Sequence, residues 1–280
     1  MAAGRRSGRA AAVARYLALG LATVVFLLPF YLLARNALLT NTELASPVWR
    51  WLPTWHWENL TGLFADPNLH LARALVNSVV IAVAQTTGVL VLSGMAGYGL
   101  ARIPYRRANL VLGAVIASLL VPASITFVPS FVLVSSLGWV STLRGLIIPG
   151  LFQALATFLF RQFFLGFPRE LEEAAMIDGL GYWGTFWRIV VPSSSGFAAA
   201  IATITFIGSW NAFLWPLVIG RDAEAWTVQV ALSTFITAQS TNYAQLFMAA
   251  IVAIAPLLVM FVFLQRWIVQ GVERTGIGGD

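Results

Sequence analysis

Long runs without a charged residue constrain this chain more than any other feature. Asn109–Leu143 continues for 35 residues without Asp, Glu, Lys or Arg, and Tyr16–Ala34 and Ala74–Ala101 are also uncharged. About 20 mostly apolar residues allow a helix to cross the hydrocarbon core of a bilayer. Only 10% of the 280 residues are charged, whereas soluble domains carry about 25%. We therefore expect an all-α, polytopic membrane protein.

Six transmembrane helices are predicted, in a single domain that covers residues 1–280 and has its core at about 72–268. The first run exceeds the roughly 7–15 apolar residues of a signal peptide, so we expect it to be retained. The third contains Pro122 and Pro129 and should hold one kinked helix, followed by a turn near Gly138. The predicted spans are Tyr16–Ala34, Ala74–Ala101, a helix within Asn109–Leu143, Gly145–Phe160, Ile189–Gly220 and Tyr243–Gln265.

The distribution of arginine predicts the orientation of these spans. All 17 basic residues are Arg, and an N-terminus inside the cell puts twelve of them inside and five outside. Cytoplasmic loops collect basic residues, so both termini are expected in the cytoplasm. The loop with Trp49, Trp51, Trp55 and Trp57 then lies outside, along the membrane surface that Trp prefers. This bias also accounts for the net charge of +6, so no nucleic-acid partner is expected.

Several functional classes lack the residues that they require. The chain has no Cys, and neither His56 nor His70 belongs to a His-Glu-x-x-His arrangement, so we expect no metal site. No Ser or Asp lies beside a plausible base in any span, so no catalytic residue and no enzymatic activity are expected. The predicted spans contain no Asp or Glu, which argues against a proton-coupled secondary transporter.

The segment from Glu173 to Pro192 is the exception to this apolar pattern. Pro168 and the following glutamates favour a helix start, and Gly179 suits the left-handed residue that ends a helix. Leu171, Ala174, Ala175 and Asp178 are predicted to share one face, on which small alanines would let another backbone approach. A second short helix is expected at Tyr182–Arg188. The residues alone leave two alternatives open, a docking segment and an interfacial amphipathic helix without a partner.

The spacing within this segment resembles a known signature. Glu173-Ala174-Ala175, three residues, Gly179, nine residues, and Ile189-x-Val191-Pro192 resemble the cytoplasmic signature of permease subunits of bacterial ABC importers, with Val191 in place of Leu. Four further segments make the chain similar to the carbohydrate-type permeases, a group that includes the maltose and glycerol-3-phosphate importers. They are Asn77-Ser78, Tyr98–Arg102, Trp210–Pro216 and Gln265–Gly271.

The resemblance implies a multi-pass subunit of the bacterial inner membrane that forms the path of a sugar-like solute. Its implied partners are a second permease, an ATPase dimer, an extracytoplasmic solute-binding protein, a carbohydrate and membrane lipid. The chain has no Gly-x4-Gly-Lys motif, so no cofactor is expected on it, and ATP and Mg would be used by the ATPase. A non-sugar cargo and an ion-coupled transporter are the alternatives.

In this family the loop at about 166–193 is a coupling helix that docks into a groove of the ATPase. The residues implied to couple are Glu173, Ala174, Ala175, Asp178, Gly179, Ile189 and Pro192. The Glu173 carboxylate either pairs with a basic residue of the ATPase or is a solvated helix charge.

Four residues are candidates for the solute path: Gln153, Trp210, Asn211 and Trp215. Asn211 and Trp215 are four apart and are expected on one face of the fifth helix, and Gln153 is expected in the middle of the fourth. Amides offer donors and acceptors to hydroxyl groups, and a Trp ring suits the C–H face of a sugar. The alternatives are hydrogen bonding between helices for the amides and interfacial anchoring for Trp215.

Overall fold

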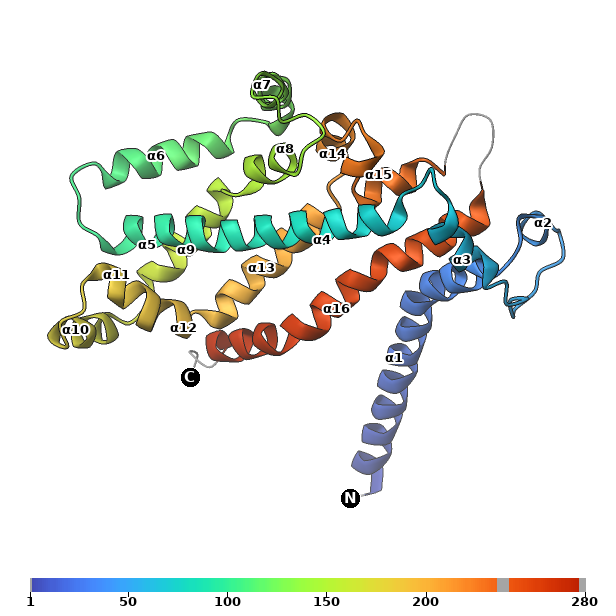
Figure 1. Cartoon of the computed structure of the whole chain (residues 1–280). Helices are drawn as coiled ribbons and strands as arrows, with labels where there is room; N and C mark the ends of the chain where they lie inside the picture. The colour runs from blue at the N-terminus through green and yellow to red at the C-terminus, as the bar shows by residue number, and fades with distance from the viewer. Residues whose placement is uncertain (1, 236–241, 277–280) are drawn as a thin grey trace. The chain divides into compact units, whose positions relative to one another are not determined.

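The computed structural model describes residues 2–235 and 242–276, and every regular element in these ranges is helical (Figure 1). The chain divides into two compact units. Unit 1 comprises Met1–Leu69 and Leu232–Ile254, and unit 2 comprises His70–Ala231 and Ala255–Asp280. The expectation of a single domain over residues 1–280 stays a prediction.

Unit 1 contains the first span and the Trp-rich loop. Its helices are α1 (Ala2–Ala37), α2 (Asn41–Leu44), α3 (Glu58–Ala65) and the start of α16 (Tyr243–Gly276). The Asn59 amide donates to the carbonyls of Ala37 and Leu39 at 2.8 and 2.9 Å, which satisfies carbonyls that the end of a helix leaves without partners. The Arg35 guanidinium lies 4.2 Å from the ring centre of Trp49 and holds the loop to α1.

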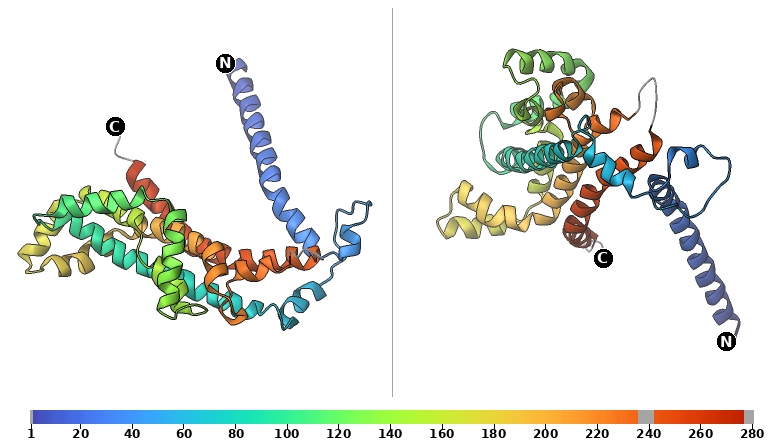
Figure 2. Two further views of the ribbon diagram at one scale, coloured as in Figure 1. Left: turned by 90° about the horizontal axis from the view of Figure 1, so that it is seen from above. Right: turned by 45° about the vertical axis from the view of Figure 1, so that its right-hand side comes forward.

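Unit 2 holds the spans on which the candidate sites lie. Its elements are α4 (Leu71–Gly88), η1 (Val89–Ser93), α5 (Gly94–Arg102), α6 (Ala108–Leu119), α7 (Ala123–Ser136), α8 (Leu143–Ile147), η2 (Ile148–Gly150), α9 (Ala154–Leu165), α10 (Arg169–Ile177), α11 (Tyr182–Thr185), η3 (Phe186–Val190), α12 (Val191–Ser193), α13 (Ser195–Trp210), α14 (Leu214–Ile219), η4 (Ala223–Ala225) and the start of α15 (Val228–Ser233). In this unit α5 packs along α9 and α4 along α13, as the two views of Figure 2 also show.

A glycine permits the close approach of α5 to α9. A Cβ built on Gly97 would lie 2.6 Å from the Cβ of Phe160 and 2.9 Å from the backbone nitrogen of Arg161. Around this contact lies a core of buried aromatic and aliphatic side chains that includes Tyr98, Phe164 and Phe186. The packing therefore fixes the end of the second span against the fourth.

The third predicted span is two helices rather than one kinked helix. α6 and α7 meet at 100°, and the expectation of a single helix is wrong. Pro122 lacks an amide proton and pushes the preceding residue out of the helical region, so the chain turns there. The expected turn near Gly138 is confirmed: this residue has φ +68, and the amides of Gly138 and Trp139 donate back to the carbonyls of Ser135 and Val134.

The fifth span is also shorter than expected from Ile189–Gly220. The helical segment Tyr182–Ser193 bends by 79° into α13, which ends at Trp210. At the bend, the Ser194 hydroxyl donates to the Val190 carbonyl at 2.6 Å, a contact that bends helices. After Trp210 the helix stops ahead of Pro216, which could not donate to the carbonyl four residues before it.

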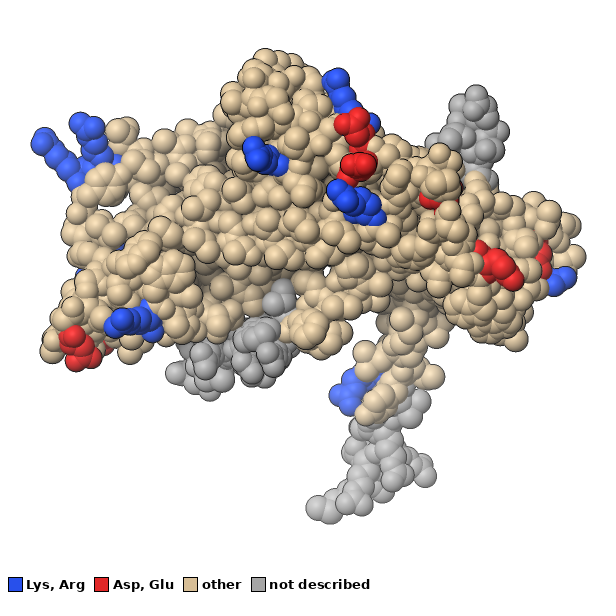
Figure 3. All heavy atoms as spheres, in the orientation of Figure 1, with Lys and Arg blue, Asp and Glu red and all other residues tan. Residues whose placement is uncertain are grey.

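The described residues include four helices that are long and apolar enough to cross a membrane, or six if each bent pair forms one span. The four are Ala14–Ala37, Leu71–Arg102, Leu143–Leu165 and Tyr243–Phe263, so four of the predicted spans are found close to their predicted positions. On the face drawn in Figure 3, charged side chains gather near α10 and near α14. The all-α polytopic fold is confirmed.

Candidate functional site

The helix α10 begins after Pro168 and ends in a glycine-dependent turn. Gly179 has φ +81, in the region that glycine adopts most readily. The Leu180 amide donates to the Ala175 carbonyl at 2.9 Å and the Gly179 amide to the Met176 carbonyl at 3.0 Å. These two bonds form the Schellman motif that closes helices. The helix, the break and their positions agree with the sequence prediction.

The faces of α10 differ in part from the prediction. Leu171, Ala174 and Asp178 are exposed, whereas Ala175 is only 3% exposed and faces the interior of unit 2. The prediction that Ala175 shares an exposed face with the other three residues is therefore wrong. Ile177, at 86% exposed, lies on the outer side together with the exposed Glu173. The outer side of α10 thus offers an apolar residue, a small alanine and carboxylates to whatever lies against it.

A buried ion pair attaches α10 to the end of the second span. Nε of Arg102 lies 3.1 Å from Oε1 of Glu172, and the two side chains are 5% and 8% exposed. The same guanidinium donates to the carbonyl of Phe167, in the turn before α10. Burial raises the pKa of the Glu172 carboxyl above its ordinary value, and the charges of Arg102 and Arg169 oppose that rise. This pair was not predicted from the sequence, although Glu172 is the glutamate next to the signature.

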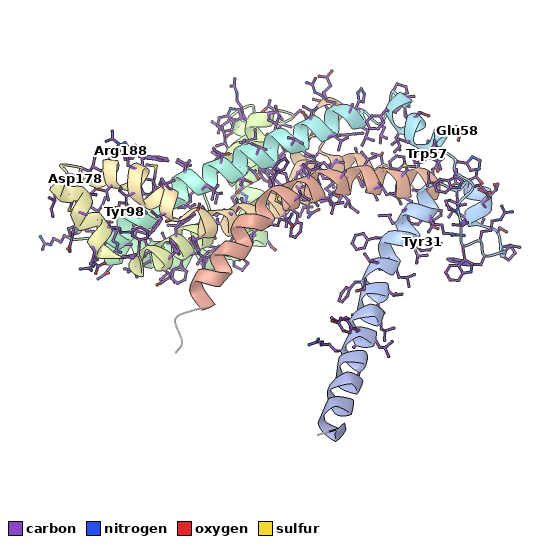
Figure 4. The ribbon with its side chains drawn as sticks, turned by 90° about the horizontal axis from the view of Figure 1, so that it is seen from below. Tyr31, Trp57, Glu58, Tyr98, Asp178 and Arg188 are labelled. Atoms are coloured by element: carbon purple, nitrogen blue, oxygen red, sulfur yellow. The ribbon has the colours of Figure 1, made fainter. Side chains whose placement is uncertain are left out.

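The second half of the segment continues as α11, η3 and α12. Val190 is fully buried, Ile189 is half-buried and Pro192 is exposed. The ring of Phe186 lies 5.1 Å from that of Tyr98, so this half is also seated on the end of the second span. Figure 4 shows Tyr98, Asp178 and Arg188 at this end of unit 2.

A groove opens between α10 and the chain that follows α5. Its volume is about 870 Å³, and Arg102, Arg106, Arg169, Glu172 and Tyr182 contribute polar groups to its wall. Met176 and Leu100 supply apolar surface. The groove therefore lies immediately beside the ion pair.

The structure separates the four residues predicted for the solute path. Trp210 is 1% exposed and stacks on Phe206 with ring centres 6.0 Å apart, inside unit 2. Trp215 lies in α14, and its indole nitrogen donates to the Gly145 carbonyl at 3.0 Å. Asn211 only caps α13, so the expectation that Asn211 and Trp215 share one helical face is wrong, because the helix ends before Pro216.

Both amides, in contrast, lie on the surface of unit 2. Asn211 is exposed, and its side-chain oxygen accepts a 3.3 Å bond from the Gln229 amide. Gln153 is also exposed and lies between η2 and α9, where Pro149 interrupts the fourth span. It is mid-span as expected, but at a break in the helix rather than within it.

The structure adds polar groups that the sequence analysis did not single out. The Gln85 amide nitrogen donates to the Leu146 carbonyl at 2.9 Å, and its oxygen accepts from the Ser209 hydroxyl at 2.6 Å. A Cβ on Gly150 would lie 2.3 Å from the Gln85 nitrogen, so the glycine makes room for this amide. Gln85 is one of two amides in the uncharged run Ala74–Ala101, the other being Asn77, and this was the available signal. Gln85 joins the second, fourth and fifth spans.

The pair Asn77-Ser78, noted for its resemblance, also has a structural role. The Asn77 amide donates to the carbonyls of Glu224 and Trp226 at 2.8 and 2.9 Å. The Ser78 hydroxyl accepts from the Val228 amide at 2.8 Å. These bonds fasten the segment after the fifth span to α4.

In residues 2–235 and 242–276 no three His, Asp or Glu side chains group as metal ligands would, and the prediction of no metal stays a prediction.

Comparison with known proteins decides the family. A model of the binding-protein-dependent transport system inner membrane component matches residues 69–274. The chain belongs to this family. The matched range includes α10, the groove beside it and the polar residues of the spans.

Individual relatives of this inner membrane component agree. It is 34% identical over 222 residues to the arabinooligosaccharides transport system permease protein AraQ of Halalkalibacterium halodurans, covering 79% of each chain. It is 33% identical over 267 residues to the sn-glycerol-3-phosphate transport system permease protein UgpE of Brucella abortus, covering 92% of this chain and 94% of the relative. Its fold matches a chain of a bacterial ABC transporter involved in alginate import, with a TM-score of 0.80, 18% identity and coverage of 93% and 97%.

Proposed function

We propose that this chain forms the translocation path for a sugar or sugar-like solute in an ATP-driven importer of the bacterial inner membrane. The observation that carries the proposal is the family match over residues 69–274, together with permease relatives named for arabinooligosaccharide and glycerol-3-phosphate transport. A transport subunit has no need of catalytic residues, and ATP with Mg would be used by a separate ATPase.

The coupling role is assigned to the segment from α10 to α12. Its outer side carries Glu173, Ala174, Ile177 and Asp178, and exposed apolar residues among charges are a feature of interaction sites. Gly179 sets the direction in which the chain leaves α10. Ala175 is buried and Ile189 half-buried against the rest of unit 2, and the exposed Pro192 lies at the end of the segment, in α12. With the twelve arginines inside, this surface and both termini face the cytoplasm.

The solute path is assigned to the exposed amides, Asn211 and Gln153. Polar groups within a membrane are costly unless they line a cavity or find partners, and both side chains lie on the surface of unit 2. Trp210 and Trp215 are assigned a structural role beside the path. Trp210 is buried within unit 2, and the indole nitrogen of Trp215 is hydrogen-bonded to α8.

The test is purification followed by reconstitution. The tagged chain, isolated in mild detergent from its native membrane, should bring with it an ATPase, a second permease and a solute-binding protein, as identified by mass spectrometry. In proteoliposomes the complex should take up an oligosaccharide or a sugar-like polyol phosphate only when ATP is present on the side of the membrane where the ATPase subunits lie. Uptake driven by an ion gradient without ATP would contradict the proposal.

A further inference from the structure

The end of the second span carries a charge where a charge is expensive. Arg102 is the last residue of α5, and its side chain is 5% exposed. A buried charge is stable only when it is paired and hydrogen-bonded. The resemblance of Tyr98–Arg102 to a segment of other permeases does not by itself indicate a role for Arg102.

The two partners of Arg102 lie on either side of the start of α10. Glu172 is in the first turns of the helix, and the Phe167 carbonyl belongs to the turn that leads into it. The guanidinium therefore makes an ion pair with the Glu172 carboxylate and a hydrogen bond to the Phe167 carbonyl, and its planar shape keeps these two contacts in a fixed relation, which an ammonium group would not. Two attachment points on one rigid group fix both the distance and the direction of α10 relative to the end of the span.

The surroundings make this attachment stand out. The groove of about 870 Å³ opens between the residues after α5 and the face of α10 that bears Glu172 and Met176. The ion pair bridges the two sides of this groove. Glu170 and Glu173, the other carboxylates of α10, are exposed, so they give the helix no comparable attachment.

We propose that the Arg102–Glu172 pair is the positioning link that passes the movement of α10 to the second span. This inference rests on the proposed coupling function and extends it to two residues outside the signature. When α10 moves with the docked ATPase, Glu172 would move with it. Separating a buried ion pair costs free energy, so Arg102, and with it the span Leu71–Arg102, would move in the same direction. Without the link, α10 could move while the span stayed behind.

The test compares ATP use with transport. In the reconstituted complex we would measure solute imported per ATP hydrolysed for Glu172→Gln and for the double variant Arg102→Met/Glu172→Met, which leaves no unpaired charge. Glu170→Gln, an exposed neighbour on the same helix, is the control. The expected result is normal assembly with the ATPase, hydrolysis within twofold of the wild type, and an at least tenfold lower transport ratio in both link variants.

A second measurement reports the link without activity. The natural chain has no Cys, so spin labels at Ile177→Cys on α10 and Leu92→Cys on the second span report one distance. The wild type should give one narrow distribution, which should broaden in the double variant and stay narrow in Glu170→Gln. An unchanged transport ratio in the double variant, or loss of ATPase binding in it, would overturn the link. A wild-type chain that binds no ATPase would instead overturn the proposed function.

Discussion

Replacing Gly179 with Val should loosen the end of α10 through backbone strain alone. Gly179 has φ +81, and a Cβ at this position would meet no atom within 4 Å. Side-chain collision therefore contributes nothing. The left-handed region costs an L-residue about 1–2 kcal/mol, and a β-branched residue belongs at the upper end of that range. Since 1.4 kcal/mol is a factor of ten, the closed turn should become about 5–30 times less favoured.

Hydrogen exchange measures this change directly. The amides of Gly179 and Leu180 are bonded to the carbonyls of Met176 and Ala175, and local opening exposes them to solvent. In Gly179→Val their exchange should accelerate by about 5–30-fold. Transport by the reconstituted complex should fall while membrane insertion is kept.

The chain offers a matched control two residues away. Gly181 has φ −78 and ψ 173, a conformation open to every residue, and a Cβ there also meets nothing within 4 Å. In Gly181→Val these amides should therefore exchange at the wild-type rate. In Gly179→Asn their rate should lie between those of the wild type and Gly179→Val, because Asn visits the left-handed region more easily than Val. Equal acceleration in Gly181→Val and Gly179→Val would refute the reasoning.

Four further predictions follow from other parts of the chain. Reporter fusions at Ala175 should read cytoplasmic and those at Thr54 external, since the arginine bias puts the first inside. Asn211→Ala should lower solute uptake several-fold while the complex stays assembled. Gly97→Ala should lower the free energy of unfolding, followed by thermal melting, by about 1–3 kcal/mol, because its Cβ would lie 2.6 Å from that of Phe160. Hydrogen bonds from Thr40 and Thr54 hold the pKa of the Glu43 carboxyl below its ordinary value of 4.5, so the loop should be stable above pH 4.5 and loosen as the pH falls through the lowered pKa.

Each has its own control. An external signal at Ala175 would reverse the orientation. Dissociation of the Asn211→Ala complex, or unchanged uptake, would remove this residue from the path. Gly99→Ala, where nothing lies within 4 Å, should be silent in the melting experiment. In fluorine NMR of fluorotryptophan-labelled protein, the acid transition of the loop should disappear in Glu43→Gln, and its persistence would assign it to another group.

Local patterns account for much of what the sequence predicted correctly. Uncharged runs of membrane length are sufficient for spans because every backbone group is bonded within its own helix. The spacing of Glu173 and Gly179 places a helix and then a left-handed residue in order, since each depends on neighbours a few residues away. These features need no knowledge of distant parts of the chain.

Contacts between distant residues decided the rest. The pairing of Arg102 with Glu172, and of Gln85 with Ser209, joins residues 70 and 124 positions apart, and no local rule selects such partners. The burial of Trp210 and of Ala175 likewise depends on which neighbouring element covers that face of the helix. The sequence by itself determined the all-α membrane fold and the helix α10 with its glycine break, because period, charge and turn chemistry are local. Only the tertiary structure decided which face of α10 is free and which arginine holds it, because burial and pairing arise when separate helices pack together.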